Sequence, residues 1–342
     1  MKKNFRSLVK ITLVLVYLVI VAGATVRMTG SGMGCPDWPK CFGYYIPPVE
    51  AEQLSWQPGR AYKKGQVIIV DEALYVAQHD FTTTTHYNEE NWAAYTKHDY
   101  AVFNPYHTWV EYINRLIGAL AGLFSFIMAM ASLRFWKKKK SITLLSWLVV
   151  IAMGFQGWLG AVVVYSVLAP VKVTLHLAVA LGIVSLILYI LHLIPRKSHS
   201  FKYDRRFKGL MLLALVLTVV QIILGTQVRQ FVDEQIKRAG EEAGDLWLQY
   251  PPLKFYVHRS FSVLVFLLNG LLFVYNRKKR LGYFRMKYVM VLLLIEILSG
   301  IGMNYAGFPF GSQAAHLIVA SLLFGVQFYL LLDTGRRSQP YY

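Results

Sequence analysis

The sequence predicts an all-α membrane protein of eight transmembrane helices, arranged as two repeated four-helix bundles with a small β-rich insertion in the first outer loop. Three observations support this class. Of the 342 residues, 56% are hydrophobic and 16% are charged, too apolar a composition for an ordinary soluble fold of this size. Several apolar runs reach about 20 residues, the length that a helix needs to cross the hydrocarbon core of a bilayer. The second half of the chain also repeats the first.

Eight apolar runs are expected to be the transmembrane helices. The first follows Lys2, Lys3 and Arg6 and so resembles a secretory signal, but no small-residue cleavage pattern appears before Arg27, and it is expected to remain as a helix. The predicted spans are residues 8–26, 114–134, 142–165, 173–194, 208–228, 256–275, 287–304 and 314–332.

The position of the basic residues predicts the topology. The net charge of +18 would suggest a nucleic-acid partner in a soluble protein, whereas here the partner is the lipid bilayer. Basic clusters fall on one side, which the positive-inside rule makes cytoplasmic. We therefore expect a multi-pass protein of a bacterial-type cell inner membrane with both termini in the cytoplasm. The clusters are Lys137–Lys140, Arg196–Lys208, Arg277–Arg280 with Arg285 and Lys287, and Arg336 with Arg337.

The first two helices of each half share sequence patterns near the outer side. The first helix ends in GATVR from Gly23, and the fifth ends in GTQVR from Gly225. The second helix begins with EYINRLIGAL and the sixth with FYVHRSFSVL, so that Asn114 aligns with His258.

The last two helices of each half repeat as well. Gln156 and Glu296 occupy equivalent places, and each precedes a histidine, His176 or His316, by 20 positions. The repeat predicts an N-terminal half over residues 1–195 and a C-terminal half over residues 196–342, in parallel orientation about an axis along the membrane normal.

An insertion enlarges the first outer loop, over about residues 50–100. Arg27 and Asn114 lie 87 positions apart, whereas Arg229 and His258 lie 29 apart. Two β-rich runs flank a turn candidate at Asp71 and Glu72, which predicts a hairpin. Its aromatic residues are expected to fill a miniature core, with sugar stacking as the less favoured alternative.

Histidines at matched positions predict a heme site. His258 and His316 begin two helices of one four-helix unit, an arrangement that can place two axial nitrogens on opposite faces of a heme. The N-terminal half has His176 but carries Asn114 where the repeat calls for a second ligand, and an amide is a poor ligand for heme iron. His107 is the alternative second ligand if its helix starts early. The sequence therefore predicts an electron-relay site in the C-terminal half and a reactive site in the N-terminal half.

Charged residues accompany these positions. Glu111 shares a helix face with Asn114 and Arg115, where it could act on protons beside a heme or could simply pair with Arg115. Arginines that recur next to the ligand positions are natural partners of heme propionates, with interfacial anchoring as the alternative. These arginines are Arg27, Arg115, Arg229 and Arg259.

Two cysteines, Cys35 and Cys41, lie in the first outer loop with five residues between them. They could form a disulfide in an oxidising compartment. Two unpaired thiols remain the alternative, because the spacing alone does not decide between them.

The quoted motifs resemble the heme A synthase family over nearly the whole chain, apart from the insertion. They are GATVRMTGSGMGCPDWPKC, EYINRLIG, the Gln156–Gly160 stretch and the TLH and AAH openings of the fourth and eighth helices. The resemblance implies an enzyme that oxidises the C8 methyl of heme O to a formyl group by successive hydroxylations, for cytochrome oxidase assembly.

The same resemblance implies cofactors, partners and residue roles. Heme b would lie between His258 and His316, the substrate heme O near His176, and Glu111 and the two loop cysteines would match functional residues of the family. A heme O synthase would be a partner, the electron donor is not specified, and a homo-oligomer is possible. The family has histidine at the place of Asn114, so the substrate iron would be held by His176 alone or also by His107 or water.

Two other functions use the same features. A membrane diheme b-type cytochrome would transfer electrons through the same histidines without modifying heme. A transporter built from parallel repeats would explain the duplication but not the matched ligand positions with adjacent arginines.

Overall fold

The computed structural model describes residues 2–194, 201–240 and 243–335. Within these residues, eight helices are long and apolar enough to cross a membrane, which confirms the predicted fold class. Arg336, Arg337 and residues 196–200 of the basic segments used to predict the topology lie outside the described residues. The helices are α1 (Lys2–Met28), α2 (Pro105–Ser132), α3 (Lys140–Tyr165), α4 (Pro170–Leu193), α5 (Arg205–Ala239), α6 (Leu253–Lys278), α7 (Met286–Tyr305) and α8 (Ser312–Thr334).

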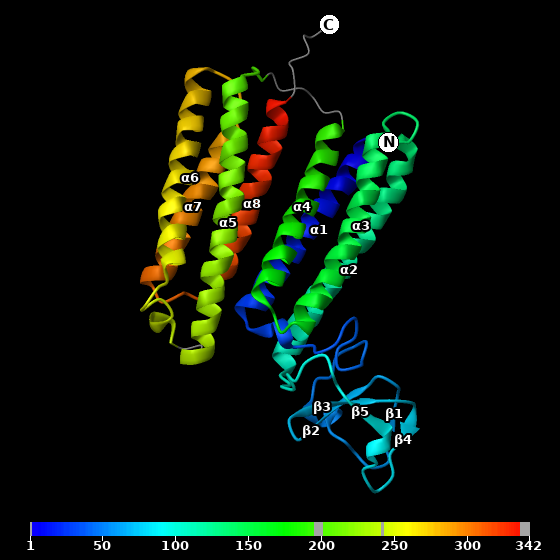
Figure 1. Ribbon diagram of the computed structural model, residues 1–342. Coiled ribbons are helices and arrows are strands. Elements are labelled where there is room, and N and C mark those ends of the chain that lie inside the picture. The colour runs from blue at the N-terminus through cyan, green and yellow to red at the C-terminus, as the bar shows by residue number, and fades with distance from the viewer. Residues whose placement is uncertain (1, 195–200, 241–242, 336–342) are drawn as a thin grey trace.

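The helices form two groups of four that stand side by side, α1–α4 and α5–α8 (Figure 1). The most extensive helix contacts lie within the sequential pairs α1/α2, α3/α4, α5/α6 and α7/α8. Each group has its own buried apolar core, one around Val149 and Ile187 and the other around Met211 and Val289. The groups meet where α1 and α4 contact α8 and where α4 contacts α5.

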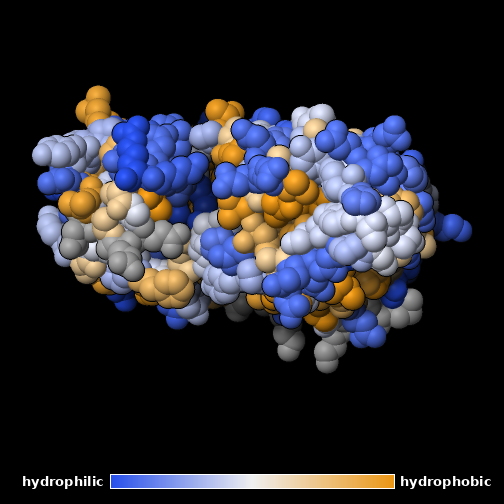
Figure 2. Space-filling model, turned by 90° about the horizontal axis from the view of Figure 1, so that it is seen from below, coloured by the Kyte–Doolittle hydropathy of each residue, from blue (hydrophilic) through white to orange (hydrophobic). Residues whose placement is uncertain are grey.

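Large apolar side chains cover the outside of both groups. Val14, Leu116, Ile151 and Leu271 are among the many that are at least half exposed along the helices, as expected of surfaces that face lipid. The end of the molecule that carries the insertion, which we call the insertion end, shows hydrophilic residues with scattered apolar ones (Figure 2).

Two helices extend beyond one end of the predicted span by nine residues or more, because those ends have local partners. α2 begins at Pro105, not near 114, since Pro105 stands at the first turn and the Asn104 side chain accepts the N–H of His107. α5 continues to Ala239 after its apolar run ends at residue 228, and the ion pair of Arg229 with Asp233 supports the extra turns. Asn114 is therefore well inside α2 and not at its start.

The insertion forms a small β subdomain with two sheets. Strands β2 (Val67–Val70) and β3 (Ala73–Ala77) pair antiparallel, β5 (Trp92–Ala94) joins β3, and β1 (Ala61–Tyr62) pairs with β4 (Phe81–Thr82). The predicted turn is confirmed, because Asp71 and Glu72 both have positive φ between β2 and β3. Tyr62 and Trp92 are buried in the subdomain core, so these aromatic residues fill it as expected.

Candidate functional site

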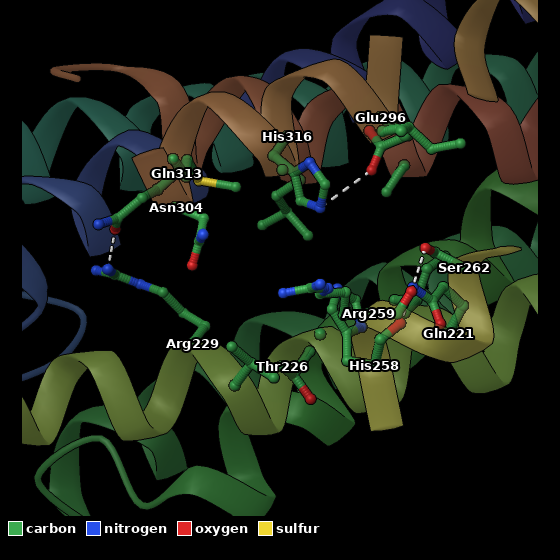
Figure 3. A pocket seen from close by; sticks show the side chains of 18 of the residues that line it. Gln221, Thr226, Arg229, His258, Arg259, Ser262, Glu296, Asn304, Gln313 and His316 are labelled. Atoms are coloured by element: carbon green, nitrogen blue, oxygen red, sulfur yellow. Dashed lines mark hydrogen bonds and ion pairs between the residues drawn. The ribbon is translucent and has the colours of Figure 1, made fainter. Parts of the chain in front are cut away.

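A cavity of about 520 Å³ opens between α5, α6, α7 and α8 in the C-terminal half. This volume lies within the range of about 300–1,000 Å³ that is usual for cofactor and ligand sites. His258 of α6 and His316 of α8 both line it, and Figure 3 shows them on facing walls with open space between. The structure thus brings together the two histidines that the repeat predicted as a pair.

Each of the four repeated ligand positions lies against a glycine of the preceding helix. A Cβ atom at Gly225 would lie 3.1 Å from Cε1 of His258, and one at Gly300 would lie 3.8 Å from Cε1 of His316. The corresponding distances are 3.5 Å from Gly160 to His176 and 4.0 Å from Gly23 to the amide oxygen of Asn114. The four helix pairs therefore share one local geometry. In each pair the glycine has no side chain and so leaves room for the histidine ring or, at position 114, for the asparagine amide.

Side chains one turn before these glycines contact the same histidines. Gln156 Nε2 donates to the carbonyl of His176 at 3.0 Å, and Gln221 Nε2 donates to the carbonyl of His258 at 3.0 Å. In the α7–α8 pair, Glu296 instead places Oε2 3.2 Å from Nε2 of His316. The imidazole of His316 consequently has a carboxyl group on its cavity side, which the other two histidines lack.

Three arginines surround the mouth of this cavity. Arg27, Arg229 and Arg259 line it, whereas Glu296 is its one acidic residue among those the structure describes. Asp233 joins two of them, with its carboxylate 2.8 Å from Arg27 and 2.7 Å from Arg229. Arg229 also donates to the Gln313 side chain. The excess of guanidinium groups makes the mouth suitable for a ligand with carboxylates.

The N-terminal half places its predicted residues at the equivalent depth of the bundle. His176 and Asn114 face Gly160 and Gly23. Nδ1 of His176, Oδ1 of Asn114 and Oε1 of Gln156 are each buried without a hydrogen-bond partner among the described residues. Buried polar atoms are normally paired, so each of these atoms has unused hydrogen-bonding capacity.

His107 lies at a different level of α2 from Asn114. It lies in the first turn of α2, and seven residues of helix place it about 10 Å along the axis from Asn114. α2 does start early, as a ligand role for His107 requires. His107 nevertheless lies two turns closer to the insertion end than Asn114 does.

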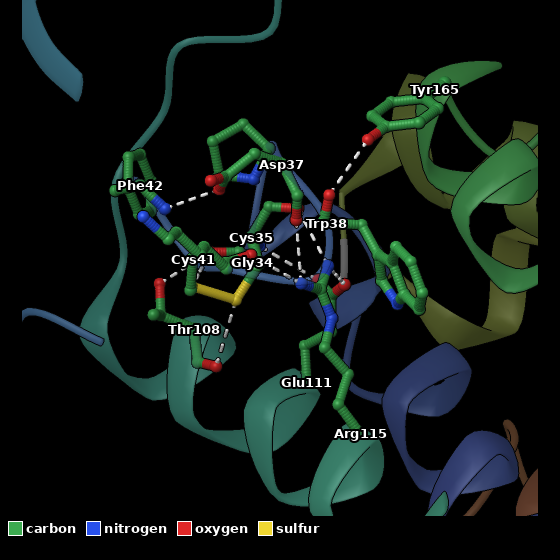
Figure 4. Close-up of polar contacts among 12 residues, drawn as sticks. Gly34, Cys35, Asp37, Trp38, Cys41, Phe42, Thr108, Glu111, Arg115 and Tyr165 are labelled. Atoms are coloured by element: carbon green, nitrogen blue, oxygen red, sulfur yellow. Dashed lines mark hydrogen bonds and ion pairs between the residues drawn. A yellow bond between two sulfur atoms is a disulfide. The ribbon is translucent and has the colours of Figure 1, made fainter. Parts of the chain in front are cut away.

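Glu111 and Arg115 hold the loop that contains the disulfide (Figure 4). Cys35 and Cys41 form a disulfide, as the sequence allowed. Glu111 is buried, accepts the N–H of Cys35 at 2.9 Å and pairs with Arg115 at 2.6 Å. Arg115 also donates to the carbonyls of Cys35, Asp37 and Lys40.

In this structure the guanidinium of Arg115 binds carbonyl groups of the disulfide loop. Its role in holding a cofactor therefore stays a prediction. The same loop contains Asp37, which accepts the N–H groups of Phe42 and Gly43. Burial raises the pKa of Asp37, and the N–H of Gly43 and the charge of Arg115 oppose that rise only in part.

Several site residues were not found from the sequence. Gln221 could have been found by overlaying helix pairs, since it precedes Gly225 by four positions as Gln156 precedes Gly160. Asp233 and Gln313 gave no such signal, because their contacts depend on how α1, α5 and α8 meet in space.

The fold and the paired histidines define a class, namely an eight-helix membrane protein with a duplicated histidine site. The sequence profile of the cytochrome oxidase assembly protein family, COX15-CtaA, matches residues 6–69 and 64–328. The chain belongs to this family. It is accordingly a multi-pass membrane protein with a heme-related substrate or cofactor.

Individual relatives agree with this assignment. The heme A synthase of Shewanella oneidensis is 30% identical over 221 residues, which cover 64% of this chain and 54% of that protein. The heme A synthase of Bacillus licheniformis is 23% identical, with 98% of both chains covered. The heme A synthase of Paracoccus denitrificans is 24% identical, with 94% of this chain and 86% of that protein covered.

Proposed function

We propose that this chain is a heme A synthase, a membrane oxidoreductase that converts the C8 methyl group of heme O into the formyl group of heme A. The observation that carries this proposal is the unequal pair of equivalent sites. One site has two facing histidines, and the other has His176 with Asn114 at the position equivalent to His258. The shared family and the name of all three relatives support the same activity.

The C-terminal cavity has the residues needed to hold heme b. His258 and His316 would be the axial ligands, and Arg27, Arg229 and Arg259 would bind the propionates at the mouth. A heme held by two histidines supplies one-electron transfer, because both iron faces are occupied. Asp233 keeps Arg27 and Arg229 next to each other at that mouth.

The N-terminal site would hold the substrate heme O through His176. The Asn114 amide, at the equivalent second position, would bind iron poorly, so that one face would stay accessible. Glu111 lies one turn from Asn114 on α2, where its Oε2 accepts the Cys35 N–H and its Oε1 pairs with Arg115. We assign to Oε2 the role of a proton acceptor during oxidation of the methyl group.

The proposal also covers location and partners. Both chain ends would lie in the cytoplasm and the insertion end outside, in a bacterial-type inner membrane. A heme O synthase would supply the substrate. The electron donor would deliver electrons to the C-terminal heme.

Pigment extraction tests the activity directly. Cells that make this protein together with a source of heme O should contain heme A, which is identified by chromatography and mass. A protein that binds heme while the cells contain only heme O and heme B would instead be a diheme cytochrome. A purified protein without a Soret band would favour the transporter.

Two variants test the assignment of the halves. His258→Ala should abolish bound heme b in the purified protein, because one axial ligand is lost. His176→Ala should leave heme b bound while abolishing heme A formation. The absorption spectrum and extracted pigment report both outcomes, and the reverse pattern would contradict the assignment.

A further inference from the structure

His316 differs from the other two repeated histidines in the partner of its Nδ1 atom. The Ser299 hydroxyl lies 2.7 Å from Nδ1 of His316. Leu159 and Leu224 occupy the equivalent positions next to His176 and His258. Nδ1 of each of these two histidines is buried without a hydrogen-bond partner within the described residues. Ser299 thus provides a contact that is specific to one of the three sites.

A hydrogen bond from Nδ1–H of His316 to Ser299 is the one that heme binding through Nε2 requires. Ser299 Oγ also lies 3.0 Å from the carbonyl oxygen of Glu296, which can only accept. With the hydroxyl proton on that carbonyl, Oγ accepts the proton of Nδ1–H. Nε2 of His316 is then unprotonated, and the Glu296 carboxyl, whose Oε2 lies 3.2 Å away, can hydrogen-bond to it only when that carboxyl is protonated.

We infer that Ser299 is a positioning residue for the C-terminal heme, acting through His316. This inference rests on the proposed function, since it requires heme b in the cavity. Ser299 fixes both the tautomer and the ring orientation of His316, and the Nδ1 hydrogen bond strengthens the imidazole as an electron donor to iron. His258 and His316 would therefore hold the heme unequally, because Nδ1 of His258 has no such partner within the described residues.

Removal of this contact should change the heme rather than the fold. In the full-length protein purified with heme, Ser299→Ala should raise the midpoint potential of heme b, because a weaker donor ligand stabilises the ferric state less. Heme retention should fall about tenfold. The ferric low-spin spectrum should shift as well, and Ser299→Thr should restore all three properties because it keeps the hydroxyl.

Ser321→Ala is a matched control on α8. The Ser321 hydroxyl donates to the carbonyl three residues before it, as that of Ser299 does, but it has no histidine contact in the structure. This variant should leave the potential and the spectrum unchanged. Leu224→Ser is the reciprocal variant, which places a hydroxyl at the equivalent position beside His258 and should lower the midpoint potential.

The outcomes separate the inference from the function on which it rests. If the wild-type protein holds heme b but Ser299→Ala has the wild-type potential and spectrum, the inference is wrong. Failure of Ser299→Thr to restore them would reduce Ser299 to a packing residue. If Ser299→Ala does not fold, an unchanged potential in Leu224→Ser overturns the inference. A wild-type protein without any bound heme would refute the proposed function and this inference together.

Discussion

At the residue scale, the packing of histidine against glycine determines how closely each ring is held. The same contact occurs at all four repeated positions, but the gap differs, and His258 has the shortest one at 3.1 Å from the site of a Cβ on Gly225. The gap at Gly300 is 3.8 Å, an ordinary van der Waals distance. An added methyl group should therefore affect the two axial ligands unequally.

Gly225→Ala should weaken heme b binding, because the new methyl group must displace the His258 ring or the helix. An overpacking cost of about 1–3 kcal/mol corresponds to about five- to 150-fold weaker binding. Heme titration of the purified protein measures this. Gly300→Ala is the matched control and should bind heme within about threefold of wild type; equal effects of the two variants would contradict the packing argument.

The histidines of the site could be predicted from the sequence, because His176 and His316 each follow a repeated polar residue by 20 positions and His258 aligns with Asn114 in the repeat. The Ser299 contact could not, since it depends on the rotation of α7 against α8. The role of Arg115 depends on the path of a loop that is distant in sequence from α2.

At the element scale, the insertion is part of the support of the disulfide loop. Val67 of β2 donates to the carbonyl of Phe42 at 3.1 Å, and Tyr95 and His98 both contact the carbonyl of Pro36. Cys35 and Cys41 share an apolar cluster with insertion residues. The β2–β3 hairpin could be predicted from its two β-rich runs and their turn, whereas its docking on the loop could not, because no local pattern specifies it.

Gly43 is the position where this docking is closest. It has a φ of +78°, and a Cβ there would overlap the carbonyl of Gly65. Gly43→Ala should therefore detach the insertion from the loop and accelerate tryptic cleavage within residues 50–100 by tenfold or more, since about 1 kcal/mol of backbone strain adds to the overlap.

Gly59→Ala controls for the backbone strain in this experiment. Gly59 has a φ of +74°, but nothing lies within 4 Å of its Cβ position. Its cleavage rate should rise by less than that of Gly43→Ala. Similar rates for the two variants would show that strain alone, and not the contact with Gly65, governs the docking.

At the scale of the whole molecule, the two halves are joined by close packing in the middle and by polar contacts near the insertion end. The Tyr17 hydroxyl of α1 donates to the carbonyl of Ser321 on α8 at 3.3 Å. Thr174 of α4 lies 3.1 Å from Thr226 of α5, hydroxyl to hydroxyl. The repeat predicted the two bundles, but the faces through which they meet followed only from the structure.

Gly325→Ala should loosen this interface. A Cβ at Gly325 would overlap the Tyr17 hydroxyl, while the ring carbon that bears it would be 3.4 Å away. The variant should reduce stability by about 1–3 kcal/mol in detergent, as measured by thermal unfolding. Tyr17→Phe combined with Gly325→Ala should recover most of the difference, because the overlapping oxygen is gone. A double variant as unstable as Gly325→Ala would contradict the proposed contact.

The cavity of the C-terminal half takes part of its lining from the other half of the chain. Ala24, Arg27 and Met28 of α1 line it together with residues of α5–α8, and Arg27 shares Asp233 with Arg229. Cutting the chain near residue 195 would therefore separate the sequence repeats but would remove one side of the cavity. The C-terminal half depends on α1 to complete its cavity, so it could not be expressed alone as a self-sufficient module.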